Sequence, residues 1–288
     1  MAKIRSETGF LLVQGAPIYY EVAGQGQPLL LIHAGVADSR MWDEQFEVFA
    51  QQYEVIRYDL RGFGQSSFPA GAFANYADPA MLLDFLNIKQ AHVIGTSFGG
   101  KIALDFTLAY PERVLSLVLV APSVGGHKSA AEVLRFEAEE EALLEHDDLA
   151  GATELNLRMW VDGPWRTAEQ VDAAVRQKVG EMQYHAFTVP MPAEAEELTL
   201  NPPAITRLDE VRMPTLLIVG DYDIPDKLAL TQKLAAEIPN ARQVIIPGVA
   251  HMVSLEKPEE FNRVVLDFLS QETNLIEYDR RFESRNEL

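Results

Sequence analysis

Ser97 lies in a glycine-rich pentapeptide, Gly95-Thr96-Ser97-Phe98-Gly99, between an apolar run that ends at Ile94 and a helical pattern that begins near Lys101. The G-x-S-x-G spacing at a strand-to-helix turn is typical of a nucleophilic serine. Small residues suit this turn because it is strained and bulky neighbours would collide with adjacent backbone. At a helix start the N–H of Phe98 would be free to donate to an oxyanion. The alternative is a turn that only packs tightly.

A serine hydroxyl needs a general base, and the base needs an orienting carboxylate. His251 follows the last predicted strand, and loops at the carboxyl ends of parallel strands open at one edge, where Ser97 also lies. The loop after residues 215–220 holds three candidate acids, Asp221, Asp223 and Asp226. The chain order serine, aspartate, histidine is the one this type of turn uses. On the residues alone the three aspartates remain alternatives, although Asp226 most resembles a helix cap or a partner of the helix dipole.

A second oxyanion donor is expected from the loop after the first buried strand, His33-Ala34-Gly35-Val36. The backbone N–H of either Gly35 or Val36 would supply it. A glycine after a strand also serves as an ordinary turn, which is the alternative here.

Apolar strands alternate with helical patterns along most of the chain. The predicted strands are 28–33, 53–58, 91–95, 114–120, 215–220 and 243–246, and the predicted helices are 36–51, 76–86, 98–110 and 225–238. Residues 10–14 and 17–22 read as an antiparallel hairpin at a sheet edge. This alternation of strands and helices predicts an α/β fold with a parallel sheet and helices on both faces.

The alternation stops between residues 126 and 205, where the chain is helical and polar, with sixteen acidic and six basic residues. We predict that residues 1–125 and 206–270 form the core, that 126–205 are a helical insertion, and that 271–288 form a charged, frayed tail. The large apolar residues scattered in the insertion are Trp160, Trp165, Met182, Phe187 and Met191. They indicate either an apolar substrate pocket or the insertion's own core.

Composition excludes several functions for this 288-residue chain. The net charge of −19 has the wrong sign for attraction to nucleic acid or anionic lipid, and the absence of cysteine excludes disulfides and thiolate chemistry. We expect a cytoplasmic protein, because residues 1–9 lack a secretory apolar region and no apolar run reaches the roughly 18 residues that span a membrane. No metal-binding motif occurs, so neither metal nor cofactor is expected. Monomer and homodimer remain alternatives.

Five segments, in this order, resemble those of the α/β-hydrolase superfamily over about residues 9–270. They are the His33-Ala34-Gly35 loop, Tyr58-Asp59-Leu60-Arg61-Gly62-Phe63-Gly64-Gln65-Ser66, the Ser97 turn, Gly220-Asp221-Tyr222-Asp223 and Gly248-Val249-Ala250-His251. The resemblance implies a mostly parallel eight-stranded sheet with an inserted helical cap. It also implies a catalytic triad of Ser97, Asp223 and His251. Two residues depart from the family pattern: Ala34 replaces the usual glycine of the oxyanion loop, and Phe63 replaces a frequent histidine.

Within this superfamily, the residues favour ester or lactone hydrolysis. Haloalkane dehalogenases and epoxide hydrolases have an aspartate where this chain has Ser97, and carbon–carbon bond hydrolases usually have a tryptophan where it has Met252. Residues 251–258 are similar to those of 3-oxoadipate enol-lactonases and small carboxylesterases. The resemblance thus implies a small-molecule ester or lactone substrate. A non-catalytic or very slow ligand-binding or receptor protein, a cofactor-free perhydrolase or haloperoxidase, and a carbon–carbon bond hydrolase are alternatives.

The acidic insertion bears on the substrate's charge. An anionic substrate would meet an unfavourable field unless a local arginine offset it. The candidates are Arg135, Arg158, Arg166 and Arg176, each of which could instead pair with nearby acids on a helix surface. The sequence therefore favours a neutral or apolar ester or lactone as the substrate. Its expected contacts are Trp160, Trp165, Met182 and Phe187.

Overall fold

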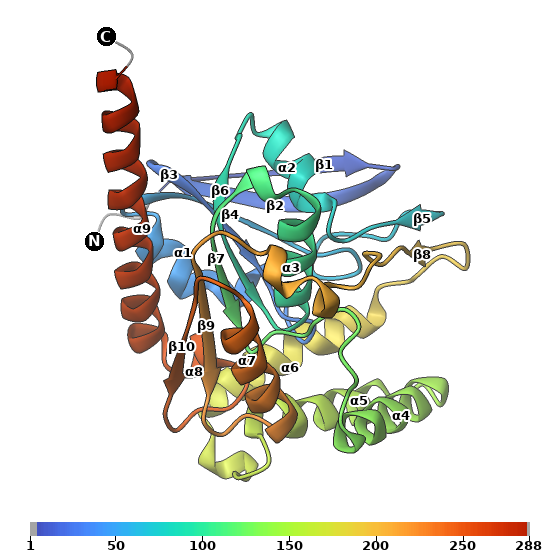
Figure 1. Cartoon of the computed structure of the whole chain (residues 1–288). Helices are drawn as coiled ribbons and strands as arrows, with labels where there is room; N and C mark the ends of the chain where they lie inside the picture. Colours follow the sequence, from blue (N-terminus) through green and yellow to red (C-terminus); the bar gives the residue numbers. More distant parts are fainter. Residues whose placement is uncertain (1–4, 287–288) are drawn as a thin grey trace.

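Eight strands in the described part of the chain, residues 5–286, form one sheet in the computed structural model (Figure 1). Across the sheet they are β1 (Ser6–Val13), β2 (Ala16–Gly24), β4 (Tyr53–Tyr58), β3 (Gln27–Ile32), β6 (Ala91–Thr96), β7 (Val114–Val120), β9 (Thr215–Gly220) and β10 (Ala241–Ile246). The pairs β1–β2 and β2–β4 are antiparallel, and all other neighbours in the sheet are parallel. The predicted sheet and its edge hairpin are confirmed.

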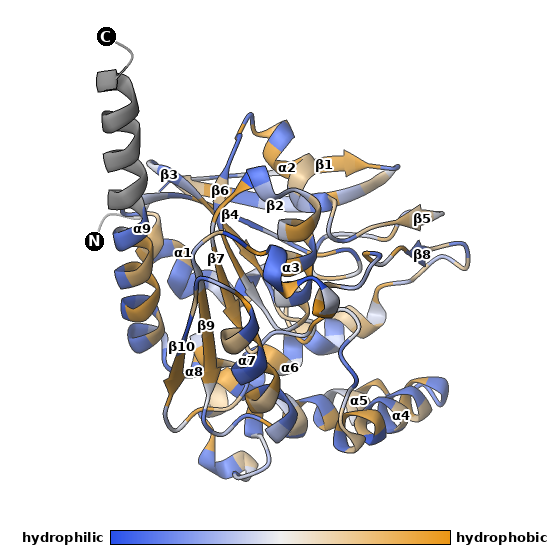
Figure 2. Cartoon of the chain, viewed as in Figure 1, coloured by the Kyte–Doolittle hydropathy of each residue, from blue (hydrophilic) through white to orange (hydrophobic). Residues whose placement is uncertain are grey.

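Helices cover both faces of this sheet because alternate side chains of a strand point to opposite sides. Leu29 and Leu31 of β3 belong to one apolar cluster, which includes residues of α1 (Asp43–Phe49), α8 (Val253–Glu256) and α9 (Pro258–Asn286). Leu30 and Ile32 belong to a second cluster with α2 (Asp78–Phe85), α3 (Phe98–Ala109) and α7 (Pro225–Glu237). Figure 2 shows the apolar residues concentrated in the central strands and the inward faces of these helices.

The segment between β7 and β9 contains three further helices, α4 (Ala131–Glu145), α5 (Leu149–Asn156) and α6 (Ala173–Thr188). They lie at the end of the sheet toward which β9 and β10 point (Figure 1). Val161, Val179 and Met182 share the first apolar cluster with Ala34 and Met252, so these helices pack directly onto the loops at that edge. We call residues 126–205 the cap segment.

Three local features differ from the sequence expectation. The predicted helix 36–51 begins later, as a 3₁₀ turn at Ser39–Trp42 whose cap is Asp38, followed by α1. A two-stranded sheet pairs β5 (Ala72–Phe73) with β8 (Glu196–Glu197). The charged tail expected from residue 271 is helical as far as Asn286, where α9 ends; its Glu, Leu and Arg residues favour helix. Residues 287 and 288 lie outside the described part.

No helix among the described residues has the length and apolar character needed to cross a membrane.

Candidate active site

Ser97 occupies a strained turn between β6 and α3. Its backbone has φ 54° and ψ −113°, in the region that residues with a side chain rarely adopt. Hydrogen bonds hold this conformation: Ser97 N–H donates to Val120 O at 2.9 Å, and Ser97 O accepts from the N–H of Ser123 at 2.9 Å and of Lys101 at 3.0 Å. The serine is therefore fixed at the carboxyl end of the central strands.

Two glycines beside Ser97 allow this turn to form. A Cβ on Gly95 would lie 2.3 Å from Gly99 O, and a Cβ on Gly99 would lie 2.3 Å from His33 O. Neither approach is compatible with a side chain. The small residues of the pentapeptide thus have the packing reason that the sequence predicts.

His251 and Asp223 form a buried hydrogen-bonded pair at the same sheet edge. His251 Nδ1 lies 2.8 Å from Asp223 Oδ2, and each side chain is 1% exposed. Because an ionised carboxylate only accepts, Nδ1 is the donor and Nε2 carries the free lone pair. The other carboxylate oxygen, Asp223 Oδ1, accepts from Ile224 N–H at 2.8 Å, which fixes the acid. His251 Nε2 is buried and has no hydrogen-bond partner among the described residues, Ser97 included.

Backbone contacts connect the two halves of the site across the sheet edge. Ala121 N–H donates to Ile218 O at 2.8 Å, and Asp221 N–H donates to Ile246 O at 3.1 Å. The loops after β6, β7, β9 and β10 are therefore neighbours, with Ser97 on the first and His251 on the last. Hydrogen bonds between a nucleophile and its base are often long without substrate and tighten when it binds.

The other two candidate aspartates have different contacts. Asp221 Oδ1 accepts from Gly248 N–H at 2.5 Å, in the loop that precedes His251. Asp226 lies in the first turn of α7, where a carboxylate suits the helix dipole, and it accepts from Ala130 N–H at 3.2 Å at the start of α4. Asp223 is the aspartate that contacts the histidine.

The expected oxyanion donors also lie side by side. Phe98 opens α3, so its N–H has no acceptor within the helix. A Cβ on Gly35 would lie 3.3 Å from Phe98 Cβ, which puts the loop after β3 directly against this residue. In that loop Ala37 N–H is bonded to Ala34 O at 3.1 Å, whereas those of Gly35 and Val36 donate to no other described residue. Both remain candidates for the second donor.

Trp160 of the cap segment contacts the histidine. It lies in a π-helical turn, Leu157–Asp162, and its ring centroid is 4.7 Å from that of His251. Phe136 of α4 supports the indole edge-on at 5.4 Å. Extra backbone residues of this π type are frequent at functional sites.

The remaining predicted cap contacts differ in exposure. Met182 is buried in the apolar cluster under the cap segment, and Phe187 is half-buried. Trp165 and Met191 are 65% and 64% exposed, so we do not include them in the site. A large apolar residue in a sequence carries no sign of which way it faces.

Three of the four cap arginines are already ion-paired with acidic residues. Arg176 pairs with Asp162 at 2.8 Å, Arg166 pairs with Glu256, and Arg158 pairs with Glu154 at 3.1 Å. Arg135 lies exposed on α4. The buried cation beside the site is instead Lys227 of α7, which the sequence reasoning missed because a lysine in a helix usually reads as a solvated surface residue.

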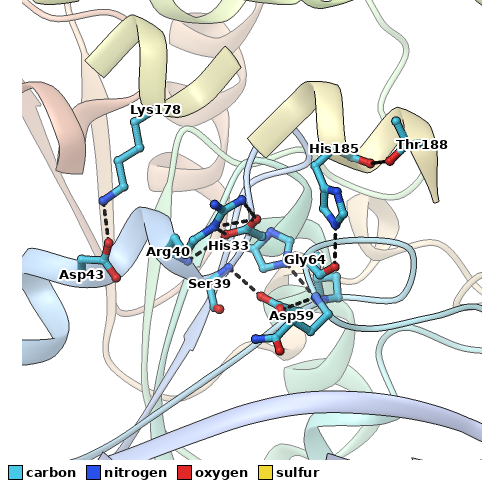
Figure 3. Close-up of polar contacts among 12 residues, drawn as sticks. His33, Ser39, Arg40, Asp43, Asp59, Gly64, Lys178, His185 and Thr188 are labelled. Atoms are coloured by element: carbon cyan, nitrogen blue, oxygen red, sulfur yellow. Dashed lines mark hydrogen bonds and ion pairs between the residues drawn. The ribbon is translucent and has the colours of Figure 1, made fainter. Parts of the chain in front are cut away.

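Asp59 and His33 organise the loops between the sheet and α6 (Figure 3). Asp59 accepts from the backbone N–H of Ser39 and of Gln65, both at 2.8 Å. His33 Nε2 accepts from Leu60 N–H at 2.8 Å, and burial lowers the pKa of His33, so the neutral ring is favoured. The Asp59 loop and His33 are therefore structural parts of this edge.

Two contacts attach α6 to these loops. His185 Nε2 is 2.9 Å from Gly64 O, and Lys178 Nζ is 2.8 Å from Asp43 Oδ2 (Figure 3). A polar cavity of about 460 Å³ lies here, with Asp38, Arg40 and His185 in its wall.

Among the described residues, no group of three or more acidic, histidine or cysteine side chains is arranged to hold a metal ion.

The mostly parallel sheet, its two helical layers and the serine on a strand-to-helix turn define the α/β-hydrolase class. A family model of the alpha/beta hydrolase fold matches residues 27–258, and the chain belongs to this family. A relative from Azorhizobium caulinodans named "Putative carbamate hydrolase RutD" is 32% identical, over 89% of this chain and 96% of its own.

Two further relatives cover most of the chain. Carboxylesterase YbfK of Bacillus subtilis is 26% identical, over 84% of this chain and 79% of its own. The solved structure of Est816, described as an N-acyl homoserine lactone degrading enzyme, is 27% identical with a TM-score of 0.72, over 90% of this chain and 100% of its own. The family's hydrolases thus include proteins that are named for different carbonyl substrates.

Proposed function

We propose that this protein is a serine hydrolase that cleaves a carboxylic ester or lactone through an acyl-enzyme. The observation that supports it most is the buried His251–Asp223 pair, in which His251 Nε2 has no hydrogen-bond partner among residues 5–286, at the sheet edge where Ser97 lies in its strained turn. This arrangement is suited to removing a proton from a serine hydroxyl.

In the proposed reaction, His251 Nε2 takes the proton of Ser97 while Oγ attacks the carbonyl carbon. Asp223 stabilises the imidazolium and keeps the ring oriented. The N–H of Phe98 and that of Gly35 or Val36 bind the oxyanion of the tetrahedral intermediate. The C–O bond to the alcohol then breaks and His251 returns the proton to the leaving oxygen. Water, activated by His251, hydrolyses the acyl-enzyme and restores the serine.

Relatives named for ester and lactone substrates are consistent with this reaction class, although others of similar identity are named 2-hydroxy-6-oxononadienedioate/2-hydroxy-6-oxononatrienedioate hydrolase. YbfK is named a carboxylesterase and Est816 a lactone-degrading enzyme. Met252, which follows the histidine where carbon–carbon hydrolases usually have a tryptophan, is fully buried in the apolar cluster. The relative with a carbamate hydrolase name makes carbamates a second candidate, because carbamate cleavage would use the same acyl transfer.

A panel of methyl and p-nitrophenyl esters, lactones and a carbamate, graded in acyl length and charge, tests the proposal with wild type and Ser97→Ala. We expect a burst of alcohol product followed by steady turnover in wild type, and a loss of about 10⁴-fold or more in kcat for Ser97→Ala. Turnover of an ester that is equal in both proteins would overturn the assignment. Saturable binding without a burst would indicate a ligand-binding protein, and peracid formation from acetate and peroxide a perhydrolase.

A further inference from the structure

Lys227 is a buried lysine that the proposed reaction does not use. It lies in the first turn of α7 and is 5% exposed. Its ammonium donates to Ser123 Oγ at 2.8 Å and to Pro122 O at 3.3 Å, both in the loop after β7. A lysine is rarely buried to this extent unless its charge has a partner.

The direct neighbours of the proposed nucleophile and base surround this ammonium. Ser123, which accepts from Nζ, donates its own N–H to Ser97 O at 2.9 Å. On the other side, Nζ lies 5.8 Å from the centre of the Trp160 ring, whose centroid is 4.7 Å from that of His251. Ser123 therefore links Lys227 to the backbone of Ser97, and Trp160 links it to the ring of His251.

The charge of Lys227 lacks an ion-pair partner among the described residues. Both of its hydrogen-bond acceptors are neutral oxygens, and its only other recorded partner among the described residues is the face of the Trp160 ring, so one of its three N–H donors has no oxygen acceptor. Burial lowers the pKa of Lys227, and the nearby carboxylates of Asp223, Asp226 and Glu137 oppose that effect without reaching ion-pair distance. A buried cation of this kind is an incomplete site that an anion would complete.

We infer that Lys227 selects substrates that carry a carboxylate, which binds to its free N–H beside the scissile carbonyl. The inference rests on the proposed hydrolase function and specifies its substrate class. It replaces the expectation of a neutral substrate that was drawn from the sequence. That expectation weighed only the four cap arginines, each of which is either ion-paired or exposed. The acidic cap repels an anion over long distances, and dissolved salt screens this repulsion. The contact with Lys227 acts at short range and is screened much less.

The test compares esters that differ only in a terminal carboxylate: monomethyl succinate, glutarate and adipate against methyl butyrate, pentanoate and hexanoate. Each is assayed with wild type, Lys227→Met and Lys227→Arg. Lys233→Met is the matched control, because Lys233 lies on the same helix but pairs with Glu237 at the surface. Circular dichroism and melting temperature report whether each variant is folded.

We expect wild type to prefer at least one charged ester over its neutral partner. Lys227→Met should lower kcat/KM for that charged ester by about 10- to 100-fold relative to the neutral one, as loss of a charge-assisted hydrogen bond predicts. Lys227→Arg should retain part of the preference, and Lys233→Met all of it. Equal losses on both esters, or a wild-type preference for the neutral ester at every length, would overturn the inference.

A binding measurement separates this inference from the proposed function. Folded Ser97→Ala protein, with and without Lys227→Met, is titrated calorimetrically with monomethyl adipate and methyl hexanoate. If the adipate binds more tightly than the hexanoate, and if Lys227→Met removes this difference, the carboxylate site is supported. Should no ester be turned over, only the hydrolase assignment fails. Binding of the adipate that is unaffected by Lys227→Met would reject the site whatever the turnover.

Discussion

The indole of Trp160 lies against the imidazole of His251, with ring centroids 4.7 Å apart and planes inclined by 42°. This contact joins the cap segment to the proposed base. Trp160→Ala should lower kcat/KM by about fivefold, because an aromatic contact of this type contributes about 1 kcal/mol and positions the ring. Trp160→Phe should recover most of the loss. Trp165→Ala is the control, since that side chain is 65% exposed, and an equal effect of both alanine variants would contradict the assignment.

Asp223→Asn should reduce kcat by roughly 10³- to 10⁴-fold with little change in KM. The amide would donate to the histidine and favour the wrong tautomer, while the size of the side chain is unchanged. Steady-state kinetics on the best ester of the panel provide the measurement. Asp226→Asn is the matched control and should stay within about threefold of wild type, because its carboxylate contacts the start of α4 instead. Comparable losses in both variants would indicate that neither aspartate is specifically the acid.

Gly99→Ala should destabilise the fold, because its Cβ would lie 2.3 Å from His33 O and 2.5 Å from Ile32 O. We expect a loss of at least about 2 kcal/mol, and a fall in melting temperature of about 5 °C or more. Gly125→Ala is the comparison, since the nearest atom to its Cβ would be 3.6 Å away. A Gly99→Ala protein that melts with wild type would show that the turn tolerates a side chain.

His92 should make the protein less stable in acid. Its imidazole is buried between Ser116 Oγ and Gln27 Oε1, both at 2.7 Å, and burial lowers its pKa to about 4. The unfolded chain takes up this proton near pH 6.5 and the folded chain only near pH 4. Stability is therefore lost as pH falls through this window, by up to about 3 kcal/mol.

Urea unfolding at several pH values between 4 and 7 measures this effect. His92→Gln should reduce the slope of the unfolding free energy against pH by most of the part that His92 contributes. His146→Gln, at an exposed position after α4, should leave this slope as in wild type. A wild-type stability that is flat over this range would contradict the expected protonation.

Most of the sheet could be predicted from the sequence because its strands are continuous apolar runs and its helices have apolar residues at helical spacing. The pairing of β5 with β8 could not, since two residues carry no periodic signal and their partners are distant in the chain. The helical form of the tail was not predicted, because its charges were weighed more heavily than its helix propensity.

The proposed site divides in the same way. Ser97 and His251 were found from local pattern and chain order, and Asp223 from the family resemblance, whereas Lys227 has no motif around it. Its role in our proposal depends on burial and on contacts with Ser123 and Trp160, which only the packed structure brings together. Likewise, nothing in the sequence distinguishes Trp160, which is partly buried against His251, from the exposed Trp165.

Lys227 belongs to a helix of the sheet-bearing core, while the cap segment contributes Trp160 to the same place. If the buried ammonium determines which substrates are accepted, selectivity for charge and selectivity for shape reside in different parts of the chain. Replacing residues 126–205 with the corresponding segment of a relative should then change the size of ester accepted, while the preference for an anionic group stays with the recipient core.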